Sequence, residues 1–292
     1  MCHKGGGIVL TLKNDTSQIA FNGIDYVLTS ADFGSIDATH TTAKGAGQTG
    51  ERLMNTSLDT RNIEIVGFIR AKSAADMKTK KAVLYQMCDP RKSFRVLPDD
   101  SLSLTCNTTD TVKFASSKLL NNHSVAQFVI DAECFDPLFA DAVARYRKIA
   151  EWASNFIWPL SIPSTGFTFA DRNDSLITTL TNSGDIETGM LIHFTASATV
   201  VNPVLTNIDT GEFIRINRTF VAGETVVINT NYGQESAYSY IGDLIQNVIN
   251  SVDLDSTFLQ APVGVSNLHF KATTNTTSMT VTIYFYQKYL GV

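Results

Sequence analysis

The stretch that decides the fold class is Asn202–Tyr232, which reads NPVLTNIDTGEFIRINRTFVAGETVVINTNY. In it Ile214 and Ile216 fall on one face of an expected strand, and Arg215 falls on the other. This period of two is typical of a strand with one buried face. A second strand is expected over Thr225–Asn229, and Asp-Thr-Gly and Ala-Gly-Glu supply the turns. Short strands of this kind need neighbours to bury their apolar faces, so the segment predicts a compact all-β module.

Length and composition agree with a packed β protein. The 292 residues suit two domains or one large β domain, and the 43% of hydrophobic residues supply an ample core. The net charge of −5 argues against nucleic acid as the main partner. The N-terminus lacks the apolar core of a secretion signal, and no stretch is long enough to span a bilayer, so no membrane partner is expected. The one basic cluster is interpreted as the wet face of a helix: Lys72, Lys78, Lys80 and Lys81.

The N-terminal half combines strands with one long polar segment. Gly34–Gly50 is small and polar, and is interpreted as a long loop or an extended hairpin arm with a function. The next strand, Ile63–Ile69, is apolar on both faces, which predicts cover on both sides by a helix or by another subunit. Ser73 opens a capping box for a helix that Pro90 ends. Phe139–Trp152 is predicted to be a second, shorter helix.

No residue pattern indicates a reactive centre. Gly45–Gly50 matches GxGxxG but lacks the strand before it and the helix after it that a dinucleotide site needs, so a flexible glycine loop is expected. The histidines are isolated, no GxSxG is present, and the four scattered cysteines are expected to be reduced. We therefore predict no catalytic residues, no cofactor and no metal site. Two carboxylate pairs in turn-like sequence are interpreted as bonding their own backbone: Asp171 with Asp174, and Asp253 with Asp255.

Several segments in a particular order resemble the distal tail protein family of long-tailed, siphovirus-type bacteriophages. The similarity covers nearly the whole chain and rests on the order and spacing of the segments, since each alone is a strand-turn pattern. They are GERLMNTSLDTRNIEIVGFIRA (Gly50–Ala71) with its helix, CFDPLF (Cys134–Phe139), NPVLTNIDTGEFIRIN (Asn202–Asn217) and YFYQKYLGV (Tyr284–Val292).

The resemblance implies a mainly β fold of two β-sandwich domains. Residues 1–161 would form a ring-forming hub domain with a long arm and a helix, and residues 162–292 a galectin-like sandwich. The arm would lie at about Ser35–Arg52, and the strand covered on both sides at Asn62–Arg70. Candidate residues for the ring and arm interface are Gly45, Gly47, Gly50, Arg52 and Phe68.

The same resemblance implies a structural, non-enzymatic role. Six copies would close into a homo-hexameric ring that caps the tail tube protein. The ring would join the tube to a tail-associated fibre or lysin protein, and would be the hub on which baseplate and receptor-binding proteins assemble. The protein would reside at the tail tip of the virion, made and assembled in the cytoplasm of the bacterial host. Such a ring interface is heterologous, so each subunit needs two different patches, and an arm can supply one.

An alternative function is a carbohydrate-binding adhesin that recognises host cell-wall polysaccharide through the C-terminal sandwich. The sugar-binding constellation of galectins is not found, because both tryptophans, Trp152 and Trp158, precede that domain. Strand tyrosines can stack on sugars, but half-buried packing explains them more simply. The candidates are Tyr232, Tyr238, Tyr240, Tyr284 and Tyr286.

Overall fold

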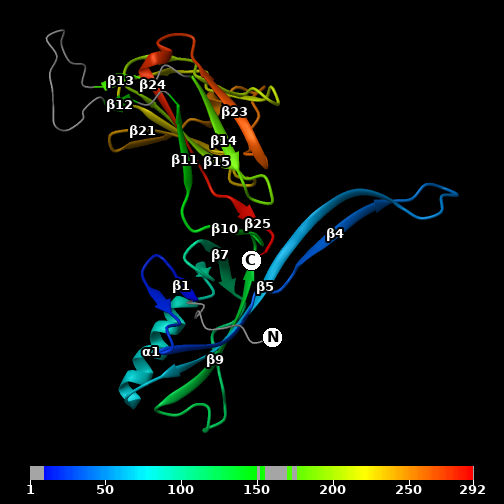
Figure 1. The fold of residues 1–292 in the computed structure, drawn as a ribbon, viewed down its shortest axis with the longest axis vertical. Coiled ribbons are helices and arrows are strands. Elements are labelled where there is room, and N and C mark those ends of the chain that lie inside the picture. Colours follow the sequence, from blue (N-terminus) through cyan, green and yellow to red (C-terminus); the bar gives the residue numbers. More distant parts are fainter. Residues whose placement is uncertain (1–9, 150–151, 155–169, 173–175, 292) are drawn as a thin grey trace. The chain divides into compact units, whose positions relative to one another are not determined.

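The computed structural model describes residues 10–149, 152–154, 170–172 and 176–291 (Figure 1). It divides into two compact units, Met1–Ala142 with Tyr289–Val292, and Val143–Lys288. We call these unit 1 and unit 2. The boundary expected between residues 161 and 162 falls among residues that the structure does not describe. Strands dominate both units, which confirms the predicted mainly β fold of two sandwich domains.

Unit 1 is built on one antiparallel sheet of eleven strands, whose main path runs β2-β1-β6-β7-β9-β5-β3. The sheet surrounds a core that includes Leu12, Ile65 and Phe128, none of them exposed. The strands on the path are β1 (Thr11–Lys13), β2 (Gln18–Ala20), β3 (Tyr26–Asp32), β5 (Arg52–Arg70), β6 (Phe94–Leu97), β7 (Leu102–Thr108) and β9 (Val125–Cys134). Those beside it are β4 (Ile36–Ala43), β8 (Lys113–Phe114), β10 (Phe139–Asp141) and β25 (Lys288–Tyr289).

The long strand β5 changes character along its 19 residues. Its second half alternates strictly, with Ile63, Ile65 and Ile69 buried in the core. The other face, which was also expected to be covered, is half-buried at Val66 and Phe68 and exposed at Glu64. This half pairs along its length with β9 on one side and with β3 on the other. Position 67 also lies on the buried face, and glycine fits there because a Cβ would come within 2.7 Å of the Phe128 ring and of the Val27 carbonyl oxygen.

The helix α1 (Ala74–Met87) confirms the expectation for the segment after Ser73. The Ser73 hydroxyl accepts a hydrogen bond from the Asp76 N–H at 3.2 Å, and the Asp76 carboxylate accepts one from the Lys72 N–H at 2.9 Å. The side of the helix that enters the core holds Met77, Leu84 and Met87. The face of the helix that carries the lysines is only partly exposed to solvent, since the Lys80 Nζ forms an ion pair with a carboxylate oxygen of Asp25 at 2.7 Å.

The structure corrects the expectation that every cysteine is reduced. Cys106 on β7 and Cys134 on β9 form a disulfide between neighbouring antiparallel strands, with Cα atoms 4.3 Å apart. Their separation of 28 residues concealed the pairing, because strand register rather than spacing brings them together. Cys88 is a free, buried thiol, and burial raises its pKa to about 12.

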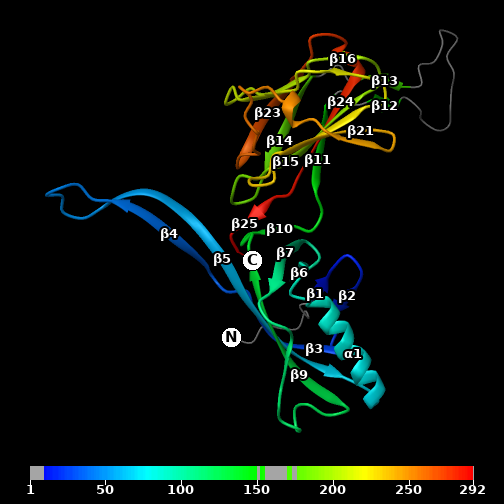
Figure 2. The ribbon, with the colours of Figure 1, turned by 180° about the vertical axis from the view of Figure 1, so that it is seen from behind.

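Unit 2 is a β-sandwich of a six-stranded and a four-stranded sheet (Figure 2). The six-stranded sheet consists of β11 (Arg145–Ile149), β24 (Met279–Phe285), β15 (Met190–Ala196), β20 (Thr225–Asn229), β21 (Ser236–Ile241) and β22 (Leu244–Asn247), in that order. The four-stranded sheet consists of β14 (Ile177–Asn182), β23 (Gly264–Lys271), β17 (Val204–Asn207) and β18 (Phe213–Arg215). Two short pairs accompany them, β12 (Trp152–Ser154) with β13 (Ala170–Arg172), and β16 (Val200–Val201) with β19 (Thr219–Phe220). Two single 3₁₀ turns, Ile249–Ser251 and Thr276–Ser278, complete the described elements.

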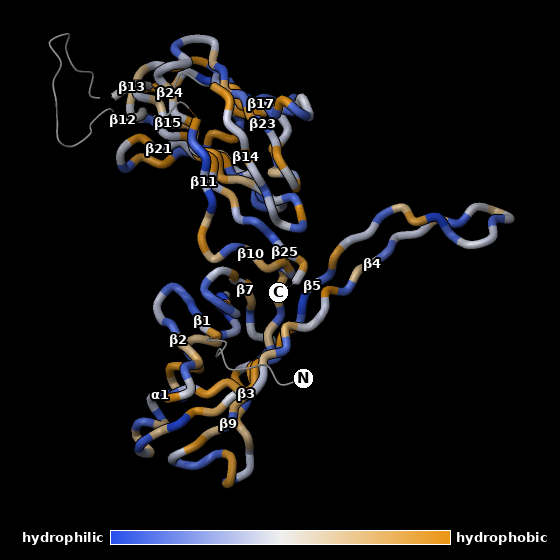
Figure 3. The backbone as a smooth tube through the Cα atoms, in the orientation of Figure 1, coloured by the Kyte–Doolittle hydropathy of each residue, from blue (hydrophilic) through white to orange (hydrophobic). Residues whose placement is uncertain are grey.

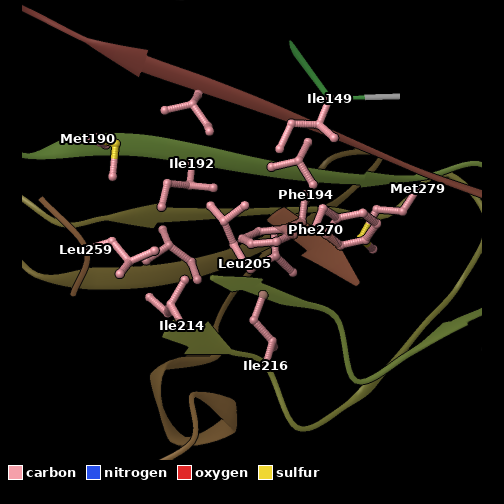
Figure 4. Packing of buried hydrophobic residues seen from close by; sticks show 14 of the residues in the cluster. Ile149, Met190, Ile192, Phe194, Leu205, Ile214, Ile216, Leu259, Phe270 and Met279 are labelled. Carbon is pink, nitrogen blue, oxygen red and sulfur yellow. The ribbon is translucent and has the colours of Figure 1, made fainter. Parts of the chain in front are cut away.

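The core of this sandwich lies between the two sheets (Figure 4). Phe194 of the six-stranded sheet and Phe270 of the four-stranded sheet meet with ring centroids 6.4 Å apart. The strands of Asn202–Tyr232 take part in both sheets, and Ile214 and Ile216 are fully buried as predicted. The two predicted strands are not partners, because β18 joins the four-stranded sheet and β20 the six-stranded one.

The predicted helix over Phe139–Trp152 is wrong. The segment instead contributes strands β10 and β11 and the start of β12. It also crosses the unit boundary after Ala142, so β10 extends the sheet of unit 1 and β11 covers the edge of β24 in unit 2. The helix was expected from local residue preference, but an exposed sheet edge needs a hydrogen-bonding partner, and this tertiary demand decides the conformation.

Candidate assembly site: the arm and its base

The main projecting feature of unit 1 is a two-stranded arm, β4 with the first part of β5 (Figures 1 and 2). The pairing runs from Ala43 opposite Arg52 at the tip to Ile36 opposite Arg61 at the base. The arm is thus a hairpin, one of the two interpretations that the sequence allowed. It is longer than the expected Ser35–Arg52, because a hairpin needs a return strand, and here the return strand continues to Arg61.

The glycine motif forms the loop at the tip of the arm. Gly47 and Gly50 have φ angles of 74° and 80°, in the left-handed region that favours glycine. The side-chain oxygen of Gln48 accepts a hydrogen bond from the Gly45 N–H at 3.0 Å, and this closes the turn. The glycines therefore have a conformational reason to be present. Contrary to the expectation from the sequence, a strand, β4, does precede them, but β5 follows them instead of the helix that a dinucleotide site requires.

The arm exposes apolar side chains that a lone hairpin cannot bury. Leu53 is 56% exposed, Met54 60% and Leu58 42%. Figure 3 shows short hydrophobic stretches interrupting the otherwise polar arm. An isolated two-stranded hairpin is marginally stable in water, and exposed apolar residues add an unfavourable hydration term. Marginal stability and exposed apolar side chains are both expected of a segment that packs against another protein surface.

Arg61 holds the base of the arm together. Its guanidinium donates to the carbonyl oxygens of Pro137 at 2.8 Å, Phe33 at 3.2 Å and Leu290 at 2.6 Å. The Arg61 side chain also lies over the ring of Phe139, 4.8 Å from its centroid. These bonds join four separate segments of unit 1 at the point where the arm leaves the sheet.

Arg61 is a buried cation that lies beside an open cavity. The residue is 3% exposed, and burial lowers the pKa of its guanidinium. No ion pair to Arg61 is found among the described residues. A cavity of about 580 Å³ adjoins it, and its lining includes Asp32, Leu58 and Phe139.

A second apolar surface lies on the outer face of the sheet of unit 1. Phe68 stands between Val27 on β3 and Gln127 on β9, and all three are half-buried. Val66 and Val129 continue this strip in the same way. The strip faces away from the core, because the alternate residues of β5 are the buried ones.

The structure thus separates the five predicted interface residues into two places. Gly45, Gly47, Gly50 and Arg52 lie together at the tip of the arm, whereas Phe68 lies on the body of the sheet. Sequence reasoning missed Arg61 and the exposed apolar residues of the return strand. One signal was present: Arg61 lies two residues before Ile63 and thus in phase with the alternating apolar positions, and a charged residue on a buried face needs a partner.

The other candidate sites have structural explanations or fall outside the described residues. One carboxylate oxygen of Asp253 accepts from the Asp255 N–H at 3.0 Å, and the other accepts from Arg215 at 3.1 Å. Asp174 of the other carboxylate pair is not among the described residues. Within the described ranges no group of three or more His, Cys, Asp or Glu side chains is placed to hold a metal ion.

The five tyrosines differ in exposure. Tyr232 is 71% exposed, and the other four are half-buried or at most 40% exposed.

None of the helices in the described part of the chain is both long and apolar enough to cross a membrane.

Two family models match separate parts of the chain. The model of the siphovirus-type tail component, C-terminal domain, matches residues 183–289. The model of the phage tail protein RIFT-related domain matches residues 15–130. Together the two matches span most of the chain, one in each unit.

Solved structures share this fold over nearly the whole length. The crystal structure of the Dit protein (gp 19.1) of phage SPP1 has a TM-score of 0.66 at 14% identity, over 96% of this chain and 99% of that one. A chain of the phage P2 baseplate in its activated conformation with Ca has a TM-score of 0.59 at 11% identity, over 97% and 99%. The same baseplate with Sr gives 0.60 at 10% identity, over 98% and 100%. No curated protein sequence matches the chain. The two family models show that the chain belongs to the distal tail protein family of siphovirus-type phages, as a structural protein of the phage tail, and the fold shared with the solved structures agrees with this.

Proposed function

We propose that this distal tail protein acts as a hub by closing into a homo-hexameric ring through unit 1. The observation that carries this proposal is the arm, a hairpin with three exposed apolar side chains on its return strand. A closed ring with a heterologous interface needs two different patches on every subunit. The arm offers one patch, and the outer strip around Phe68 offers the other.

Within this proposal the predicted interface residues have distinct roles. Gly45, Gly47, Gly50 and Arg52 would contact a neighbour through the tip of the arm, and Phe68 through the sheet. Leu53, Met54 and Leu58 would supply the apolar area, at roughly 25 cal/mol for each Å² of apolar surface buried. Arg61 would orient the arm through its bonds to the base.

The partners follow from the hub role. One rim of the ring would meet the tail tube protein, and the other a tail-associated fibre or lysin protein, with receptor-binding proteins at the periphery. The similar chains in the phage P2 structures belong to a baseplate, which supports assembly of this kind. We propose that the protein has a structural role and no enzymatic activity. The ring would assemble in the host cytoplasm and then become part of the virion.

The test is the mass of the full chain in solution at micromolar concentration, together with electron microscopy. We expect a species of six times the 31.9 kDa chain mass, and ring-shaped particles with a central hole. A closed ring of fewer than six subunits would contradict the hexamer but would still agree with the hub role. A strictly monomeric protein that also fails to assemble with tail tube protein would contradict the ring itself.

A further inference from the structure

A polar pocket opens on unit 2, and none of its lining residues belongs to the arm. Its volume is about 370 Å³, within the usual range for small-molecule sites. Its lining combines two cations, two amides, a hydroxyl and two aliphatic side chains. These are Arg215, Lys271, Asn202, Asn217, Thr273, Val204 and Ala272.

Strand register explains why the two cations face one space. Val204 on β17 lies directly opposite Arg215 on β18 and, on its other side, opposite Lys271 on β23. The three residues therefore form a row on one face of the sheet, with the small valine between the two long cations. Neighbouring strands are about 4.8 Å apart, so the stems of the cations stand about 10 Å apart across the valine.

Arg215 is held in position before any ligand arrives. Its guanidinium donates to an Asp253 carboxylate oxygen at 3.1 Å and lies over the Phe213 ring, 4.9 Å from the centroid. The same carboxylate oxygen accepts a hydrogen bond from the Asn217 amide at 3.0 Å. Asp253, which is not part of the lining, therefore fixes both donors. A guanidinium has five N–H donors, so most of those of Arg215 remain available.

Lys271 supplies the charge that is not balanced. It is exposed and forms no ion pair within the described part of the chain. Arg215 and Asp253 neutralise each other, so the pocket retains one net positive charge. No carboxylate and no aromatic ring belongs to the lining. A neutral sugar site typically uses an aromatic face and carboxylate acceptors, whereas the charged groups of this pocket are donors only.

We propose that this pocket binds a phosphate ester of a small polyol or sugar. The phosphate oxygens would lie over Val204, where Arg215 and Lys271 donate charge-assisted hydrogen bonds. A phosphodiester carries one negative charge, which equals the unbalanced charge of the pocket. The amides of Asn202 and Asn217 and the hydroxyl of Thr273 would bind hydroxyl groups of the carbon skeleton, for which the volume leaves room.

Calorimetric titration of the full chain at low ionic strength tests the site. The probes are glycerol 3-phosphate, a glycerol phosphodiester dimer, inorganic phosphate and glycerol. We expect saturable binding of the two esters, weaker binding of inorganic phosphate and none of glycerol. Tighter binding of the diester would indicate a phosphodiester polymer as the source, and tighter binding of the monoester a free metabolite.

Variants separate this pocket from general surface charge. Lys271→Ala should weaken ester binding by about tenfold or more, because a charged hydrogen bond is lost, and Lys271→Arg should retain most of it. Arg147→Ala removes an exposed cation of the same unit outside the pocket and should change nothing. Absence of ester binding, or equal affinities of the wild type and Lys271→Ala, would overturn the proposal. Equal affinity for inorganic phosphate would overturn the assignment to an ester. None of these outcomes depends on ring formation.

Discussion

Arg61 shows how a single buried charge organises unit 1. Its side chain bonds carbonyl oxygens from three segments, and no aliphatic replacement can satisfy these acceptors. Arg61→Met should therefore lower the free energy of unfolding by roughly 2–4 kcal/mol, the cost of unsatisfied buried polar groups. Urea unfolding followed by circular dichroism measures this change.

The matched control for Arg61 lies on the same strand. Arg52 is exposed at the other end of the arm pairing, so Arg52→Met should change stability by no more than about 0.5 kcal/mol. Equal stability of Arg61→Met and the wild type would show that Arg61 does not hold the base of the arm.

Tyr26 gives unit 1 a dependence on alkaline pH. Its hydroxyl donates to the Lys80 carbonyl oxygen at 3.1 Å, and burial raises its pKa from 10.0 to about 12. The folded protein thus holds this proton more tightly than the unfolded chain does. The resulting stability is complete below pH 10 and is lost as the pH rises toward 12.

Urea unfolding at several pH values between 9 and 12 tests this dependence. Tyr26→Phe cannot ionise, so its stability should fall less steeply than that of the wild type between pH 10 and 12. Parallel curves for the two proteins would show that Tyr26 titrates alike in the folded and unfolded states.

At the scale of elements, we expect that the arm can be removed without disturbing the sheet. Ala38 lies opposite Leu58, so replacing residues 39–57 by Asn-Gly closes the hairpin with a two-residue turn of a favoured type. Arg61 and its bonds remain. We expect an intact fold, measured by circular dichroism, and loss of the ring, measured by light scattering.

Point variants distinguish the apolar contacts of the arm from its length. Replacing Leu53, Met54 and Leu58 by Ser keeps the hairpin and removes the apolar surface, so it should weaken the ring as well. Lys118→Ala changes an exposed polar residue of unit 1 outside the arm and serves as the control. A truncated protein that still forms rings would refute the role proposed for the arm.

For some elements the conformation that the local sequence favours is the one that the tertiary structure stabilises, and for others the two differ. The helix after Ser73 was predictable because its cap and its apolar side are both encoded within one segment. The strands of Phe139–Trp152 were not, because their conformation depends on edges supplied by strands far away in sequence. The same reason hid the Cys106–Cys134 disulfide.

For the whole molecule, two separate hydrophobic cores predict two unfolding events. The buried clusters share no residue, and each belongs to one unit. Differential scanning calorimetry should therefore resolve two transitions. Phe194→Ala, which empties a fully buried site in unit 2, should lower one of them, since such a cavity costs about 3–5 kcal/mol.

The assignment of the transitions follows from the unit 1 variant. Arg61→Met should lower the other transition and leave the one affected by Phe194→Ala in place. One transition that both variants lower equally would mean that the units unfold as a single cooperative body.

The sequence alone determined the mainly β class, the buried faces and the family, because alternation, turn residues and segment order are local properties of the chain. Asn202–Tyr232 illustrates this: its buried isoleucines are where the pattern of two places them. Only the tertiary structure decided that β18 and β20 enter opposite sheets, that Arg61 closes the base of the arm, and that Arg215 and Lys271 flank one pocket. Each of these depends on strand register between distant segments, which no local pattern specifies.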